Sequence, residues 1–184
     1  PGSSRPSINS DVGFWKMDGH KGGHDECGMS LCRERICMTS HSESRVVPYS
    51  ADLMFAIVAD VERYPEFVPW TVSLRVLRRE IVGKQEILTA ETVVGFRALR
   101  ERYKSRVVLD PRAGTIDVTQ VEGVFRQLEN HWRFTPEGAG CRVDFSISFE
   151  FKSKMLTAVA GSAFGLVVTQ MTRAFEERAR KLSE

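Results

Sequence analysis

Five side chains near the N-terminus are of types that could bind a metal ion. They are two histidines and three cysteines: His20, His24, Cys27, Cys32 and Cys37. Imidazole and thiolate are good zinc ligands, but structural zinc sites place paired cysteines about two to four residues apart. Here the cysteines are five residues apart, and no second pair follows. The spacing does not predict a zinc site, and we expect no bound metal.

From residue 42 onward, His131 and Cys141 are the single histidine and the single cysteine. A catalytic cysteine needs a base within hydrogen-bond reach, but the alternation of apolar and polar residues places these side chains on opposite faces of their strands. The chain has no nucleophile elbow, phosphate-binding loop or dinucleotide fingerprint. We therefore expect a protein that is not an enzyme and has no catalytic cofactor.

An aromatic and proline-rich segment, residues 64–70, is the most unusual part of the sequence. It reads Tyr-Pro-Glu-Phe-Val-Pro-Trp, and its two prolines restrict the backbone. One interpretation is a plug over an apolar core. The other is a rigid, partly exposed lip at the mouth of a cavity, because exposed apolar patches often mark contacts with membranes or partners.

Period-two alternation predicts the strands that would position these residues. The clearest is 141–152, where apolar and polar residues alternate strictly, as is typical of a strand with one dry and one wet face. Shorter runs predict further strands near 72–76, 87–94, 103–110, 116–118 and 128–134, and a short strand at 44–47.

Two helices complete the expected fold. Ser50 can cap the first helix, which should end near Tyr64 and Pro65, because proline disfavours helical backbone in the residue before it. Apolar residues at helical spacing predict the second helix over 154–182. Strands followed by a long helix predict an α+β fold, in which a curved antiparallel sheet wraps around the C-terminal helix. Such a fold can enclose a ligand-sized space.

The inward faces of these elements are rich in large apolar residues. They are Phe125, Phe134, Phe145, Phe149 and Phe151 on the strands, and Phe164, Met171 and Phe175 on the long helix. A solid core and the lining of an apolar cavity both fit this pattern. Gly161 and Gly165 interrupt the helix, which indicates either close packing on the sheet or space left for a ligand.

Composition indicates one globular domain with a tail. The 184 residues are 42% hydrophobic and carry a net charge of +2. Residues 1–41 hold six of the fourteen glycines without sustained periodicity, so we expect a disordered tail or leader there and a folded domain over 42–184. We find no transmembrane helix and no secretory signal.

Charge is uneven along the chain. Between residues 71 and 109, nine basic residues stand against four acidic ones. This excess could be a solvated face, could meet anionic lipid, or could meet RNA phosphates. The net charge gives no global case for nucleic acid, and we expect no DNA partner.

Three segments together resemble the coenzyme Q-binding START-domain family within the polyketide cyclase/START superfamily. They are residues 59–70, residues 128–134, which read Leu-Glu-Asn-His-Trp-Arg-Phe, and residues 144–152, which read Asp-Phe-Ser-Ile-Ser-Phe-Glu-Phe-Lys. The resemblance covers about residues 44–182. It implies a helix-grip fold with an apolar cavity between the sheet and the C-terminal helix.

The resemblance also implies a function and a site. Members bind ubiquinone or its polyprenylated precursors, and deliver or present it for respiratory electron transport and quinone biosynthesis. The implied partners are the polyprenyl lipid, the respiratory membrane as a peripheral contact, and quinone-biosynthesis enzymes. The ligand-binding residues expected in the cavity and its lip are Tyr64, Pro65, Phe67, Val68, Pro69, Trp70, Phe96, Phe125, Trp132, Phe145, Phe149, Phe164, Val168 and Met171.

The implied location is the cytoplasmic side of a bacterial inner membrane or the matrix side of the mitochondrial inner membrane. Two other functions stay open within the superfamily. A related group acts as ribosome-association toxins that block the joining of ribosomal subunits, and it shares the Tyr-Pro-x-Phe-Val-Pro type of segment; a ribosome or RNA partner is expected only in that case. An aromatic polyketide cyclase would need polar groups inside the cavity, whereas the inward faces offer mostly Phe, Val and Leu.

Overall fold

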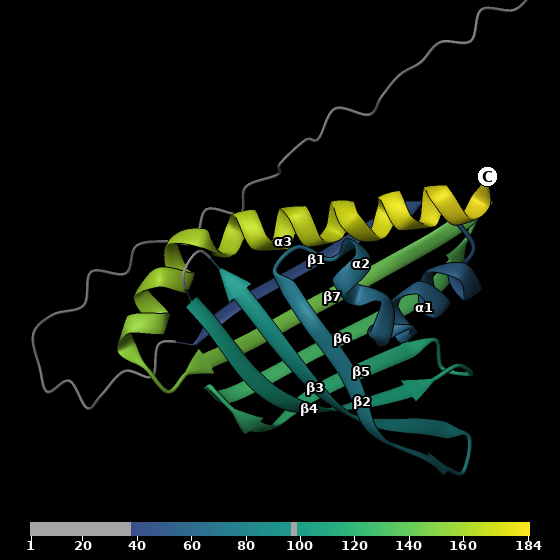
Figure 1. Ribbon diagram of the computed structural model, residues 1–184. Coiled ribbons are helices and arrows are strands. Elements are labelled where there is room, and N and C mark those ends of the chain that lie inside the picture. The colour runs from purple at the N-terminus through teal and green to yellow at the C-terminus, as the bar shows by residue number, and fades with distance from the viewer. Residues whose placement is uncertain (1–37, 97–98) are drawn as a thin grey trace, which may run out of the picture. The chain divides into compact units, whose positions relative to one another are not determined.

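The structure is a computed structural model that describes residues 38–96 and 99–184, with only the backbone described at residues 96, 99 and 159–163 (Figure 1). The histidine and cysteine cluster of the tail, the side chain of Phe96 and the surroundings of Gly161 lie outside the described residues. The elements follow the expected order, from a strand and short helices through six further strands to one long helix.

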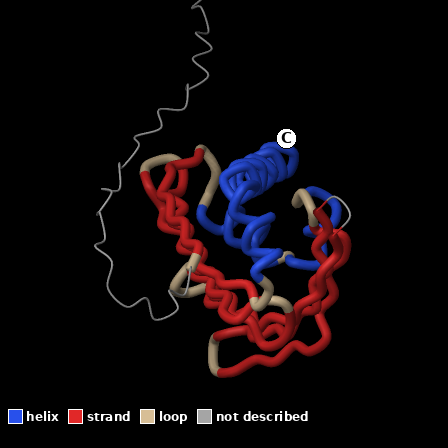
Figure 2. Tube along the Cα trace, turned by 90° about the vertical axis from the view of Figure 1, so that its left-hand side faces the viewer, coloured by secondary structure: helices blue, strands red, loops and turns tan. Residues whose placement is uncertain are grey.

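Seven antiparallel strands form one sheet in the order β1-β7-β6-β5-β4-β3-β2. Their bounds are β1 Thr39–Val47, β2 Thr71–Val82, β3 Gln85–Phe96, β4 Leu99–Asp110, β5 Thr115–Gly123, β6 Phe125–Glu137 and β7 Gly140–Phe151. Figure 2 shows the sheet curving around the helices, so that one face is covered and the other is open to solvent. The expected α+β helix-grip architecture is confirmed.

The first strand is longer than the sequence predicted. It begins at Thr39 rather than Ser44, and Thr39 pairs with Phe149 of β7. Residues 39–41, which the sequence analysis placed in the tail, therefore belong to the sheet. The alternation of β1 was missed because its inward side chains include charged ones: Arg45 donates to Glu176 of the long helix at 2.7 Å and ties this edge strand to it.

The short helices between β1 and β2 differ from the prediction. Helix α1 spans Ala51–Ala59, and Ser50 caps it as expected, because its side chain accepts a hydrogen bond from the Leu53 backbone N–H at 3.2 Å. A single 3₁₀ turn, η1 (Val61–Arg63), and a second helix, α2 (Tyr64–Phe67), follow. The expected helix end at Tyr64-Pro65 was wrong: proline occupies the first turn of α2, where its missing N–H is tolerated.

The long helix α3 spans Lys154–Ser183, close to the predicted 154–182. It crosses the covered face of the sheet (Figure 1). Phe175 and Ala179, in its C-terminal half, are almost fully buried. The side chains of α1 that complete the core are Met54, Ile57 and Val58. Packing is therefore tight where α1 and α3 both meet the sheet.

Candidate functional site

A cavity of about 360 Å³ lies between the sheet and α3. Its walls come from the inward faces of β2–β7, from residues 68–70 and from α3. Most of the lining is apolar, and pockets of this size are at the low end of those that enclose drug-sized molecules. The choice left open by the phenylalanine-rich faces is thus resolved: part of the interior is solid core and part is cavity.

The two ends of the cavity differ. We call the end beside the aromatic cluster of Trp132, Phe145 and Phe175 the floor. Trp132 and Phe175 line the cavity there, and Phe145 packs behind Trp132 with the ring centroids 4.3 Å apart. We call the other end the mouth. It is lined by Val94, Gly95, Val124, Phe151 and Leu156, where β3 and β7 end, β6 begins and α3 starts.

Four polar side chains interrupt the apolar lining between floor and mouth. They are Thr92, Tyr103, Ser105 and Asn130. Thr92 and Ser105 are 4% and 3% exposed, and the Asn130 Oδ1 atom is buried without a hydrogen-bond partner among the described residues. The sequence analysis missed this set, although Asn130 is in phase with Leu128 and Trp132 and could have been assigned to the inward face.

Two partly buried tyrosines, Tyr64 and Tyr103, line this region. Tyr64 donates a hydrogen bond to the Val58 carbonyl at 2.5 Å. Burial, reinforced by the nearby Tyr103 and Asp60, raises the pKa of the Tyr64 phenol well above its ordinary value. Burial also raises the pKa of Tyr103, while a hydrogen bond from Thr92 acts in the opposite direction. Both phenols are protonated at neutral pH, so they act as neutral hydrogen-bonding groups.

The structure brings nine of the predicted site residues to the cavity wall. They are Tyr64, Val68, Pro69, Trp70, Phe125, Trp132, Phe149, Phe164 and Met171. Four others lie elsewhere: Pro65 is exposed, and Phe67, Phe145 and Val168 pack in the core beside the cavity. Their positions make the first nine candidates for ligand contact, and a binding role for any of them stays a prediction.

The proline-rich segment, residues 64–70, packs against α3 beside the cavity and does not project as an exposed lip. The Phe67 ring packs edge-on against Phe175 at 5.4 Å, and the Arg178 guanidinium lies 5.4 Å from the Phe67 ring centroid. Glu66 accepts a hydrogen bond from Arg178 at 3.3 Å, which ties α2 to α3. Trp70, at the end of the segment, has a φ of 63°, a left-handed backbone that is uncommon outside glycine.

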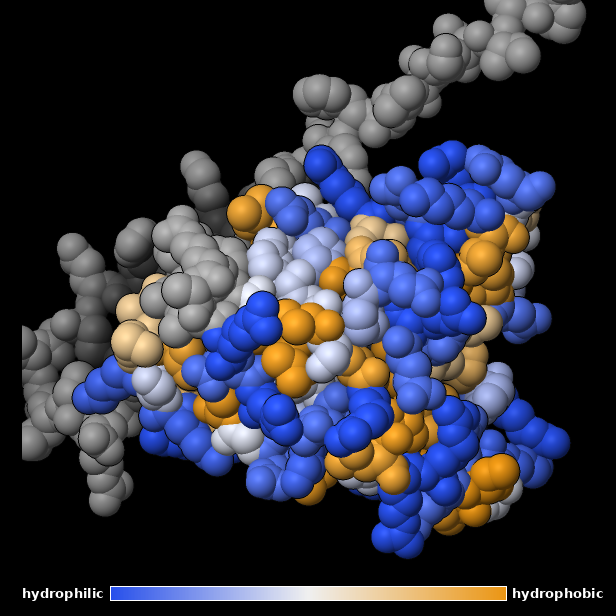
Figure 3. Space-filling view, in the orientation of Figure 1, coloured by the Kyte–Doolittle hydropathy of each residue, from blue (hydrophilic) through white to orange (hydrophobic). Residues whose placement is uncertain are grey.

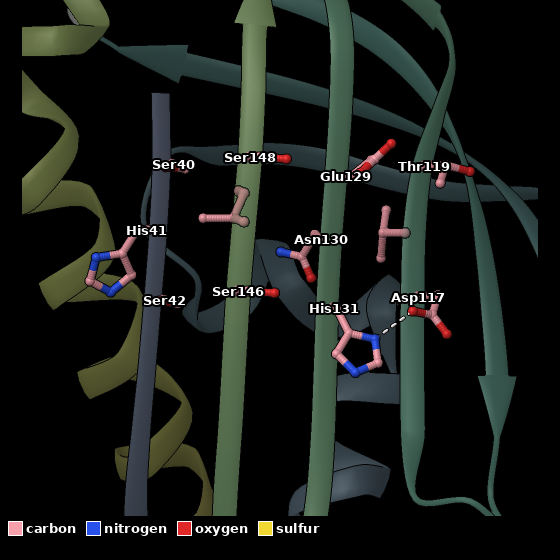
Figure 4. Close-up of a pocket in the computed structure, with 12 residues that line it drawn as sticks. Ser40, His41, Ser42, Asp117, Thr119, Glu129, Asn130, His131, Ser146 and Ser148 are labelled. Carbon is pink, nitrogen blue, oxygen red and sulfur yellow. Dashed lines mark hydrogen bonds and ion pairs between the residues drawn. The ribbon is translucent and has the colours of Figure 1, made fainter. Parts of the chain in front are cut away.

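A second, polar depression of about 440 Å³ lies on the outer face of the sheet (Figure 4). Residues of four adjacent strands line it. The polar ones in the outward phase are Ser40 and Ser42, Asp117 and Thr119, Glu129 and His131, and Ser146 and Ser148, while His41 and Asn130, in the inward phase, also border it. His131 Nδ1 is 2.5 Å from Asp117 Oδ1, and Ser146 is opposite His131 in register.

This row of Ser146, His131 and Asp117 has the residue types of a nucleophile, a base and an orienting acid. Within the part of the chain that the structure describes, however, no hydrogen bond joins Ser146 to His131, and the His131 and Asp117 side chains are 41% and 50% exposed. A nucleophile is activated by direct contact with its base. His131 also lies far from Cys141, which pairs with Pro136. In this structure the row therefore lacks the nucleophile–base contact of a catalytic triad.

Ion pairs leave most of the basic excess between residues 71 and 109 in place, because all but one of the partner acids belong to the same region. Ion pairs engage five of its bases, Arg75, Arg78, Arg79, Arg102 and Lys104. Figure 3 shows apolar side chains interspersed with hydrophilic ones on the face that it displays. Over the described residues, no helix is long and apolar enough to cross a membrane, and no three His, Cys, Asp or Glu side chains group as metal ligands.

A helix-grip protein with an apolar cavity is the class that this fold and site define. Residues 47–176 match the family described as "Polyketide cyclase / dehydrase and lipid transport", and the chain belongs to that family. Together with the relatives below, this match confirms the resemblance to START-like coenzyme Q-binding proteins.

Two curated relatives and one solved structure define the neighbourhood of the chain. It is 39% identical over 146 residues to "Coenzyme Q-binding protein COQ10 homolog B, mitochondrial" of Xenopus laevis, a match that covers 77% of this chain and 58% of that protein. It is 32% identical over 148 residues to "Ribosome association toxin RatA" of Rickettsia prowazekii, covering 79% of this chain and 99% of that protein. The solution structure of the 18 kDa protein CC1736 from Caulobacter crescentus is 39% identical, covers 79% of this chain and 98% of that chain, and has a TM-score of 0.68.

Neither of these two curated names describes an enzyme, although the family description includes cyclases. The sequence analysis argued against a cyclase from apolar inward faces alone. That argument was incomplete, because Thr92, Tyr103, Ser105 and Asn130 line the cavity. Among the described cavity residues the one side chain that carries a charge is Glu101, at the mouth, and the inner wall offers only neutral polar groups.

Proposed function

We propose that the protein binds ubiquinone or a polyprenylated precursor in the cavity, and that it delivers or presents this lipid for respiratory electron transport and quinone biosynthesis. The observation that carries the proposal is the apolar cavity between the sheet and α3, with a few neutral polar groups in its wall. The name of the Xenopus relative supports the choice of ligand class.

The chemistry of the wall suits a substituted aromatic ring with a prenyl tail. Burial of apolar surface stabilises such a complex by about 25 cal/mol per Å², less the cost of ordering the ligand. Trp132, Phe125 and Phe149 offer aromatic faces and edges to a ring. The absence of a charge from the described inner wall is consistent with a neutral ligand.

Exchange of so insoluble a lipid requires contact with a membrane, which we place at the mouth. Met155, in the first turn of α3, is 60% exposed, and the exposed Lys152 and Lys154 stand beside it. An exposed apolar side chain flanked by lysines favours the surface of an anionic bilayer. We propose a peripheral contact of this end with the respiratory membrane, on the cytoplasmic or matrix side.

The direct test is to identify what the protein carries. The chain is expressed in a quinone-making host, purified and extracted with organic solvent, and the extract is analysed by mass spectrometry and ultraviolet absorption. We expect ubiquinone or a precursor in near-stoichiometric amount. An empty extract that stays empty after incubation with quinone-loaded vesicles would overturn the proposal.

Two substitutions on neighbouring residues of β5 provide a matched control. Val118→Phe fills the cavity, because Val118 lines it, whereas Thr119→Phe adds the same ring on the outer face. We expect Val118→Phe to abolish most of the co-purified lipid and Thr119→Phe to retain it, with both proteins folded by circular dichroism. Equal retention would mean that the lipid is held outside the cavity.

Ribosome association is the second candidate function. The observation in its favour is the match to the Rickettsia relative, which covers 99% of that protein. A further feature in its favour is the net basic excess of residues 71–109, which RNA phosphates could meet, because the ion pairs there mostly use acids of the same region. A subunit-joining assay with purified ribosomal subunits separates the two functions, because a lipid carrier leaves the joining of subunits unchanged.

A further inference from the structure

Asn130 is the polar side chain of the wall that lies nearest the floor. It stands on β6 between Leu128 and Trp132, and its neighbours across the sheet are Val118 on β5 and Ile147 on β7. Its Oδ1 atom is buried with no partner among the residues described. A buried polar atom without a partner destabilises the fold, so an apolar residue would serve a purely structural wall better.

The rows of side chains on either side of Asn130 differ in character. Toward the floor, the next row is the Trp132–Phe145 pair, which is almost fully buried. Toward the mouth, the next rows are Leu128 with Phe149 and then Phe125 with Phe151. A ligand with one polar and one apolar end therefore meets its polar partner at the inner end of the cavity and its apolar partners at the outer end.

The size of the cavity supplies a second constraint. About 360 Å³ is room for a substituted ring and a short chain, and a tail of many isoprene units exceeds it. A tail that entered first would place prenyl groups against the amide of Asn130 and leave the polar head outside. A head that enters first instead places the polar ring against Asn130 and the prenyl chain along Leu128, Phe149 and Phe151.

We infer that the ligand of the proposed function above enters head first, that the Asn130 amide hydrogen-bonds its polar ring, and that its tail leaves through the mouth. The amide carries both a donor and an acceptor. It can therefore meet the carbonyl of a quinone or the hydroxyl of a quinol or phenolic precursor. Ser105 and the Thr92–Tyr103 pair line the path between Asn130 and the mouth.

The first test compares two probes on the purified full chain by equilibrium dialysis. A short-chain ubiquinone carries the polar ring, and farnesene is a prenyl hydrocarbon with no polar group. Asn130→Leu removes the amide at similar volume, and Thr119→Val on the outer face is the matched control. We expect Asn130→Leu to weaken ubiquinone binding on the order of tenfold and to leave farnesene binding unchanged. Thr119→Val should change neither.

The second test needs no substitution and uses ubiquinones of increasing tail length. With the head inside, affinity levels off once the tail reaches the mouth. Affinity that keeps rising with each isoprene unit, or an Asn130→Leu effect that is absent or equal for both probes, would overturn the inference and leave the proposed function standing. Failure of the unsubstituted protein to bind any of the probes would overturn both.

Discussion

The floor and the mouth of the cavity are built from the same kind of residue but behave differently. At the floor, Phe145 and Phe175 are each 2% exposed, because α1 and α3 both press on the sheet there. Phe151, at the mouth, and Phe164, which packs against Phe149 along the wall, are only half-buried. The difference shows that an aromatic residue on the inward face of the sheet stabilises the fold where helices pack on its ring, and lines the binding site where they leave space.

The largest effect on the free energy of unfolding is expected from a substitution at the floor. Phe145→Ala should lower the free energy of unfolding by about 3–5 kcal/mol, because it leaves a cavity beside Trp132 where neighbouring side chains have little room to collapse. Urea denaturation measures this loss. A loss below about 1 kcal/mol would show that the floor is loosely packed and that the two regions do not differ as described.

A glycine at the mouth should give the next largest effect. Gly123 has a φ of 131°, and a Cβ placed there would lie 2.5 Å from the Tyr103 Cβ atom. Gly123→Ala should therefore cost about 2 kcal/mol in stability and displace Tyr103 from the cavity wall. Gly83→Ala is the control, since it adds a left-handed alanine, at about 1 kcal/mol, in open space.

Phe164 tests the half-buried part of the cavity wall, where its ring packs against Phe149. Because its side chain is half-buried, Phe164→Ala should lower stability by only about 1 kcal/mol, while removing a ring that lines the cavity. Lipid retention, measured by extraction after loading from vesicles, should fall far more steeply than stability. If Phe164→Ala and Phe145→Ala changed the two quantities in the same proportion, the division between the floor and the half-buried wall would not hold.

Much of this arrangement could be predicted from local patterns. Strict alternation in residues 141–152 defined β7 and its inward side chains, and helical spacing defined α3 to within one residue. The same alternation carried enough information to place Asn130 inward, because it is in phase with Leu128 and Trp132. The buried face of a strand was equated with apolar residues, which is why the polar part of the wall was missed.

Other features depend on contacts between distant segments. Pro65 was expected to end a helix, yet the chain uses it to begin α2 after the turn at residues 61–63. Phe145 and Phe149 point to the same face of β7, but only Phe149 lines the cavity. Which of the two side chains is packed into the core depends on where α1 and α3 contact the sheet, and no pattern within β7 contains that information.

The last predicted effect concerns the phenols of Tyr64 and Tyr103. It leaves the stability at neutral pH unchanged and appears only at alkaline pH. Burial raises the pKa of Tyr64, beside the floor, and of Tyr103, toward the mouth. In the unfolded chain both phenols ionise near pH 10, whereas the folded protein retains their protons. Stability should therefore be unaffected below about pH 10 and fall above it, by up to about 1.4 kcal/mol per pH unit for each of the two phenols.

Denaturation at a series of alkaline pH values measures this slope, and Tyr64→Phe and Tyr103→Phe should each reduce it. The two tyrosines should differ in their response to ligand. Tyr64 is fixed by its bond to the Val58 carbonyl and by the edge of Phe175 at 5.4 Å, so its pKa should respond to lipid less than that of Tyr103. Tyr103 lies beside Phe125, at 5.2 Å between ring centroids, near the mouth. Its pKa should rise further when lipid displaces water from the cavity. Equal responses, followed by NMR of the two phenol rings, would mean that the ligand does not occupy the outer part of the cavity.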